Sequence, residues 1–184
     1  MDTRLTDGAI LLRPYRTDDV EELYEAVRES IRELQPWMPW CHPDYSIEES
    51  REWLASREDA WNNRAEYGFH VSDVSSGRFL GGVGLNQING LYRAANLGYW
   101  IRTSAAGRGV ATRAARLAAR FGFEELNLLR IEIVAATGNL ASQRVAEKVG
   151  AVREGVMRKR LFVHGVEHDA VLTSLIAEDM KCWA

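Results

Sequence analysis

Apolar residues recur with two different spacings along the chain, and the order in which the spacings alternate predicts the fold. Short apolar or alternating runs indicate strands at 9–15, 67–73, 78–89, 94–101, 130–136, 151–162 and 166–177. Apolar residues three or four positions apart indicate helices over about 17–30 and 46–64, after Gly109, and over about 139–150. This order predicts a single α/β (α+β) domain over residues 1–184, with a mixed sheet of about seven strands flanked by about four helices.

Several helix ends carry their own local signals. Ser46 with Glu49 three residues later has the pattern of a capping box, which opens the second helix. Asn139 is a suitable N-cap for the last helix, and Gly150 is a suitable C-cap. No internal repeat or domain linker interrupts the pattern.

Composition and charge exclude several classes of protein. The 184 residues are 46% hydrophobic and 27% charged, as in an ordinary globular protein, and the net charge of -3 argues against a nucleic-acid binder that works through a broad basic field. No apolar stretch approaches the length of a membrane span, and the N-terminal residues lack an apolar signal region. Cys41 and Cys182 have neither metal-ligand spacing nor a disulfide framework. We therefore expect a cytoplasmic protein with reduced thiols and no membrane or nucleic-acid partner.

The segment SAAGRGVAT, residues 104–112, is the first candidate for chemistry. The first N–H groups of a helix lack internal partners and carry positive potential, and the flanking glycines would let a phosphate approach them. Arg108 and Arg102 add positive charge nearby. On its own the pattern is also that of a tight turn, since it lacks both the Gly-Lys-Ser/Thr of a Walker A loop and the third glycine of a dinucleotide fingerprint.

Further motifs give this loop a context. They are Gly98-Tyr99-Trp100, the loop Ala106 to Ala111, Asn139 to Ser142, Lys148 to Gly150 and Glu154-Gly155. In this order and spacing, together with ILLRPYRTDD near the start and PWMPW after the first helix, the chain resembles the GNAT superfamily of acetyl-CoA-dependent N-acetyltransferases. The resemblance covers nearly the whole chain and is greatest to the ribosomal-protein N-terminal (RimJ/RimL-like) branch.

The resemblance implies where acetyl-CoA binds, without any metal. Backbone N–H groups of residues 108–112 hold the pyrophosphate, the edge of strand 99–101 pairs with the pantetheine amides, and Asn139 contacts the pantetheine arm. That strand is expected to splay from strand 130–136, which opens a cleft for the thioester. The cofactor-binding residues implied in this way are Tyr99, Trp100, Ile101, Arg102, Gly107, Arg108, Gly109, Val110, Ala111, Thr112, Asn139 and Ser142.

The resemblance also implies direct attack of a neutral amine on the thioester. A strand N–H at or near Trp100 would stabilise the oxyanion, and Ser142 would give a proton to the departing thiolate, although Ser142 could equally make only a local cap bond. Family members often carry acidic residues where this chain has Asn96 and Leu161. The other candidates for a base are His70, Glu132, His164 and His168. Because an α-amine is less basic than a lysine, the missing carboxylates favour an α-amine or another weakly basic acceptor.

Tryptophans crowd the segment that covers the acceptor end of the cleft in this family. Trp53 and Trp61 have helical spacing and are expected in the core, whereas Trp37 and Trp40 lie among prolines and are the predicted substrate-binding residues. The leading interpretation is acetylation of a protein N-terminus of the ribosomal type. The alternatives are a small-molecule amine (an amino-acid derivative, an aminoacyl-nucleotide-like toxin or an antibiotic) and a CoA-binding module without catalysis. The oligomeric state, a homodimer included, stays open.

Overall fold

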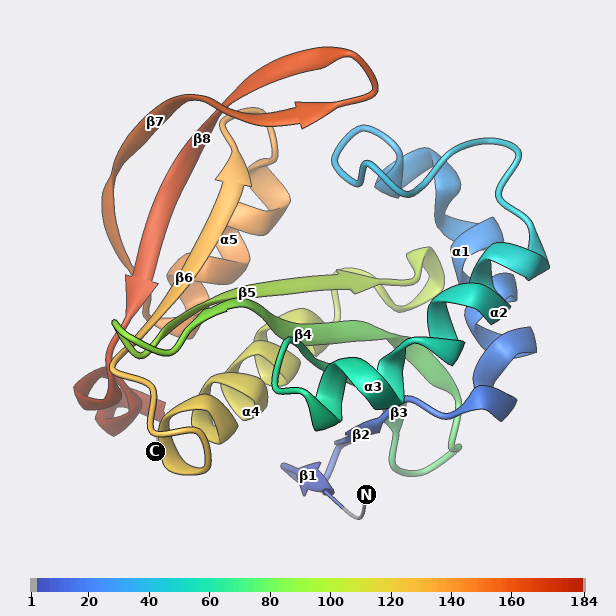
Figure 1. Cartoon of the computed structure of the whole chain (residues 1–184), viewed down its shortest axis with the longest axis horizontal. Helices are drawn as coiled ribbons and strands as arrows, with labels where there is room; N and C mark the ends of the chain where they lie inside the picture. The colour runs from blue at the N-terminus through green and yellow to red at the C-terminus, as the bar shows by residue number, and fades with distance from the viewer. Residues whose placement is uncertain (1–2, 184) are drawn as a thin grey trace.

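A computed structural model describes residues 3–183, in which eight strands form one mixed sheet in the order β1-β2-β3-β4-β5-β6-β8-β7 (Figure 1). The strands are β1 Leu5–Thr6, β2 Ile10–Pro14, β3 Tyr67–Asp73, β4 Phe79–Asn89, β5 Ala94–Ile101, β6 Arg130–Ala136, β7 Val152–Val163 and β8 Val166–Leu175. The α-helices are α1 Val20–Leu34, α2 Ile47–Ala55, α3 Arg57–Asn62, α4 Val110–Glu124 and α5 Leu140–Val149. No helix among these residues is long and apolar enough to cross a membrane.

The predicted order of elements is confirmed, with two differences. The eighth strand, β1, has only two residues and is too short to show a period. The helix predicted over 46–64 is divided at Ser56, whose hydroxyl donates to the carbonyl of Trp53 at 2.7 Å. Serine side chains compete in this way for the backbone acceptors of a helix, and the described chain therefore has five α-helices instead of about four.

The two faces of the sheet carry separate apolar clusters. On one face, α4 packs its alanines against β4, β5 and β6, and a Cβ added at Gly122 would lie 2.8 Å from Cδ1 of Ile131. On the other face, α1 and α2 pack around Tyr15, Phe79 and the partly buried Trp100. Leu97 and Trp100 of β5 belong to different clusters because side chains alternate along a strand. β5 therefore contributes side chains to both faces.

The sheet opens between its two parallel neighbours, β5 and β6. They pair only at Ala94↔Arg130, Ala95↔Ile131 and Asn96↔Glu132. Beyond these pairs β6 continues alongside β8 while β5 follows β4, and the two strands diverge (Figure 1). The splay expected for this pair of strands is thus present, and it leaves backbone groups of β5 without a neighbouring strand.

Candidate active site

The pairing of β4 with β5 determines which backbone groups of β5 face the gap. Arg102 N donates to the carbonyl of Leu80 at 2.9 Å, and the register runs without a shift from there through Gly82↔Trp100. Because alternate residues of a strand direct their N–H groups to opposite sides, the N–H of Trp100 points towards β4, whereas those of Tyr99 and Ile101 point into the gap. Of the strand N–H groups at or near Trp100 that were expected to stabilise the oxyanion, those of Tyr99 and Ile101 therefore face the gap and that of Trp100 does not.

The glycine loop precedes α4 at the end of the same strand. Gly107 and Gly109 have φ values of +75° and +78°, which glycine adopts readily, and Gly109 is the N-cap of α4. Arg113 N makes the first helical bond, to the carbonyl of Gly109 at 3.1 Å. No hydrogen bond joins the N–H groups of residues 108–112 to any other described residue. A Cβ at either glycine would meet nothing within 4 Å, so the loop is open on this side and fits an anion.

Arg102, which was expected to add positive charge near the loop and to bind the cofactor, is buried in an ion pair. Its Nε lies 3.0 Å from Oε2 of Glu29 on α1, and its Nη1 donates to the carbonyl of Phe79 at 3.2 Å. Arg102 lowers the pKa of the Glu29 carboxyl to about 2 through its hydrogen bond. The Arg102 side chain therefore links the segment that directly follows β5 to α1. Of the two arginines considered for the loop, Arg108 is exposed and stays a candidate for binding an anion.

Tyr99 and Ser142 meet across the gap. Oδ1 of Asn139 accepts from Ser142 N at 3.0 Å and caps α5, as its sequence position predicted. The Tyr99 hydroxyl donates to the carbonyl of Ser142 at 3.0 Å and lies 3.1 Å from its Oγ. Burial raises the pKa of Tyr99 to about 12. The sequence had placed only the backbone of Tyr99 at the site, and its hydroxyl is an additional proton-bearing group there.

A pocket of about 430 Å³ lies between the sheet and the helices α1 and α2. It reaches β5 at Gly98, Tyr99 and Trp100, next to the gap. Its remaining aromatic lining residues are Tyr15, Trp40, Tyr45 and Trp53. Gly68, Gly84 and Gly98 lie opposite one another on three neighbouring strands. Because glycine has no side chain, backbone atoms form this part of the pocket floor.

The two predicted substrate-binding tryptophans occupy different places. Trp40 lines the pocket, is 41% exposed, and has its ring 6.0 Å from the ring of Trp100. Trp37 does not line the pocket; its ring packs 6.3 Å from that of His168 on β8 and closes over Gly138. Trp40 therefore lies beside the pocket, whereas Trp37 packs between the α1–α2 loop and β8 on the far side of the cleft.

Both carboxylates that line the pocket are already paired. Glu49 completes the capping box of α2, where its Oε2 accepts from Ser46 N at 2.8 Å, and its Oε1 lies 2.8 Å from His42 Nε2. Glu66 forms a 2.8 Å ion pair with Arg57. At the position where the family often has an acid, Asn96 donates instead to Oδ1 of Asn86 at 3.0 Å.

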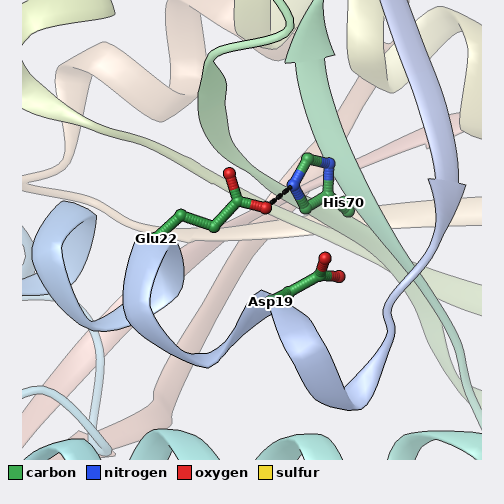
Figure 2. A group of neighbouring side chains, drawn as sticks. All are labelled: Asp19, Glu22 and His70. Carbon is green, nitrogen blue, oxygen red and sulfur yellow. Dashed lines mark hydrogen bonds and ion pairs between the residues drawn. The ribbon is translucent and has the colours of Figure 1, made fainter.

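The other candidates for a base lie outside this pocket. His70 is buried and its Nε2 lies 2.6 Å from Oε1 of Glu22, with Asp19 close by (Figure 2). Asp19 in turn holds Arg13 through two 2.7 Å hydrogen bonds. Because this arginine already occupies the carboxylate, the cluster is a charge network that fastens α1 to the sheet, and it does not suit a metal ion.

The remaining three candidates also have structural partners. His164 Nε2 lies 3.0 Å from the carbonyl of Cys41, and His168 packs against Trp37. Glu132 pairs with Arg130 at 2.8 Å. Leu161, on β7 opposite His168, does not line the pocket.

Comparisons with known proteins agree with this architecture. A family model described as Acetyltransferase (GNAT) domain matches residues 9–152. YdaF of Bacillus subtilis (strain 168), which carries the provisional name ribosomal N-acetyltransferase, is 32% identical over 175 residues, covering 94% of this chain and 93% of its own. Spermidine N(1)-acetyltransferase of Escherichia coli (strain K12) is 30% identical over 130 residues, covering 66% of this chain and 70% of its own.

A solved structure extends the similarity to the fold. RimL, a ribosomal L7/L12 α-N-protein acetyltransferase solved in complex with coenzyme A, matches with a TM-score of 0.88 at 21% identity, covering 96% of this chain and 99% of that one. The gap beside β5 and the open glycine loop are the two places where the sequence resemblance led us to expect acetyl-CoA. The chain therefore belongs to the GNAT acetyltransferase family, and it is an N-acetyltransferase whose co-substrate is acetyl-CoA.

Proposed function

We propose that the acceptor is the α-amine of a protein N-terminus, of the ribosomal-protein type. The observation that carries this proposal is the pairing of both pocket carboxylates, Glu49 with its capping box and Glu66 with Arg57. No free carboxylate among the described lining residues stands ready to deprotonate a strongly basic amine or to hold a polycation. An α-amine, with a pKa near 8, is neutral about 200 times more often at pH 7 than a lysine amine with a pKa near 10.4.

Different residues would bind the cofactor, bind the amine and donate the proton in such a transfer. Bound acetyl-CoA supplies the activated acetyl thioester. The N–H groups of residues 108–112 and the Arg108 side chain would hold its pyrophosphate, and the free edge of β5 at Tyr99 and Ile101 would pair with its pantetheine arm. The pocket beside Trp40 would receive the amine, and Ser142 would supply the proton for the leaving thiolate.

A thiol-release assay with matched acceptors tests the proposal. Peptides with a free N-terminal Ser or Ala should react faster at pH 7 than the same peptides with that end blocked and one lysine free. Spermidine serves as the third acceptor, since a relative carries that activity in its name. Faster turnover of the lysine peptide or of spermidine would contradict the assignment of an α-amine.

A small-molecule amine is the second candidate. The observation that favours it is the aromatic lining of the pocket, whose volume of about 430 Å³ lies within the usual range for small ligands. Amino-acid amides added to the same panel distinguish the two candidates. If an amide is acetylated much faster than every peptide, the acceptor is a small molecule.

A further inference from the structure

Two polar groups in the pocket have no hydrogen-bond partner among the residues that the structure describes. The Tyr15 hydroxyl is buried and makes no hydrogen bond to any described residue. The indole Nε1 of Trp100 likewise has no hydrogen bond within residues 3–183. Both residues line the pocket. An unpaired polar group in a buried site is costly, so a ligand atom that satisfies it is favoured.

Both groups converge on the bare backbone of Gly82. A Cβ built at Gly82 would lie 2.4 Å from the Tyr15 hydroxyl oxygen and 2.9 Å from Trp100 Nε1. Any side chain at position 82 would therefore displace both groups. The glycine allows Trp100 of β5 and Tyr15, which directly follows β2, to approach the same point of the pocket, and such an arrangement can donate two hydrogen bonds to one ligand atom.

On the basis of the proposed function, we propose that the Tyr15 hydroxyl and the Trp100 indole N–H bind the carbonyl oxygen of the acceptor's first residue. The acceptor is then an α-aminoacyl compound, in which this carbonyl is bonded to the carbon that bears the amine, and alkylamines and polyamines without the carbonyl are disfavoured. The indole N–H can only donate, and the Tyr15 hydroxyl keeps its proton because burial raises its pKa. Two donors suit an oxygen with two lone pairs.

The charges of the described lining residues favour a neutral carbonyl group over a free carboxylate. Among the described residues, no arginine, lysine or histidine lines it. A free carboxylate would therefore enter without a counter-charge, whereas the neutral carbonyl of an amide or peptide bond would not. The geometry thus favours the amide of a peptide or an aminoacyl derivative over a free amino acid.

The test compares each acceptor with itself across variants, which removes differences in amine pKa. Tyr15→Phe keeps the ring and removes only the hydroxyl. It should lower kcat/KM about fivefold or more for an Ala-initiated peptide and change it less than twofold for isopropylamine assayed at pH 9. Tyr67→Phe, a buried tyrosine outside the pocket, is the matched control and should leave both values unchanged.

Gly82→Ala provides a second route to the same result. Its methyl group should displace both donors and lower kcat/KM for the peptide by at least as much as Tyr15→Phe, with thermal unfolding used to select folded protein. If isopropylamine turns over too slowly, its inhibition constant against the peptide replaces kcat/KM. An equal fall for both acceptors, or no fall for the peptide, overturns the carbonyl assignment. Failure of the wild-type enzyme to acetylate any α-amine overturns the proposed function instead.

Discussion

If Ser142 protonates the leaving thiolate, we expect the Tyr99 hydroxyl to turn from the Ser142 carbonyl and to return a proton to Ser142 Oγ. The proton that the attacking amine releases then restores the Tyr99 hydroxyl. The Tyr99 hydroxyl lies 3.1 Å from Ser142 Oγ, and its pKa of about 12 keeps it protonated across the neutral range. Ser142→Ala and Tyr99→Phe should therefore each lower kcat about a hundredfold, the usual contribution of a positioned acid. The double variant should fall by about the same factor because both changes break one relay.

The stability of the same variants follows from the contacts. Tyr99→Phe removes hydrogen bonds of 3.0 and 3.1 Å to Ser142, which at about 1 kcal/mol each costs about 2 kcal/mol, or about 4–8 °C in Tm. Ser142→Ala removes only the Oγ contact and costs about half as much. The activity losses should greatly exceed what these shifts explain at 25 °C.

The assay combines thiol release, calorimetry with acetyl-CoA and thermal unfolding. Affinity for acetyl-CoA should change less than threefold in either single variant. Tyr92→Phe, an exposed tyrosine between β4 and β5, is the control for the loss of a phenol. A fall in kcat of about ten-thousandfold in the double variant would show independent roles and refute the relay. If each single variant lowers kcat only a few-fold, Ser142 acts only in the local structure at the start of α5.

Three further predictions follow from the site and its supports. Gly109→Glu should weaken acetyl-CoA binding at least tenfold by calorimetry; Gly77→Glu, at an equally open glycine with φ +72°, measures the cost of backbone strain alone and should leave affinity unchanged. Trp40→Ala should raise the acceptor KM several-fold with acetyl-CoA affinity intact, whereas Trp37→Ala, outside the pocket, should raise it less; the reverse order would contradict this placement. Glu29→Gln should lower Tm at pH 7. Because the folded-state pKa of Glu29 lies below its ordinary value of 4.5, its contribution is complete above about 4.5 and is lost as pH falls to about 2, so a Tm difference that stays constant down to pH 2 would contradict the ion pair.

Features that depend on neighbouring residues could be predicted from the sequence. The strands follow from alternation, and the glycines of residues 107 and 109 mark a left-handed turn before a helix. The capping box of Ser46 also forms as its spacing indicates. In contrast, Ser56 divides a helix whose apolar period continues across it, because its hydroxyl competes for a carbonyl, and a hydrophobic pattern does not report this.

Features that depend on distant partners could not be predicted. Arg102 is close to the glycine loop in sequence, yet its guanidinium pairs with Glu29, which lies 73 residues away in the chain. The pocket combines Tyr15, Trp40 and Glu66 from three separate segments, and no spacing relates them. Single-sequence patterns describe contacts along one element, whereas the site is formed between elements.

The gap between β5 and β6 divides the sheet into two parts, which are joined by three β5–β6 residue pairs. Amide protons of Tyr99 and Ile101 lack a partner strand, so they should exchange rapidly with solvent in the free enzyme. A ligand arm that pairs along this edge completes the ladder and should slow their exchange. Mass action then raises the free energy of unfolding by about 2.7 kcal/mol at a ligand concentration a hundred times Kd. A melting curve recorded against coenzyme A analogues therefore measures occupancy of the gap without any turnover.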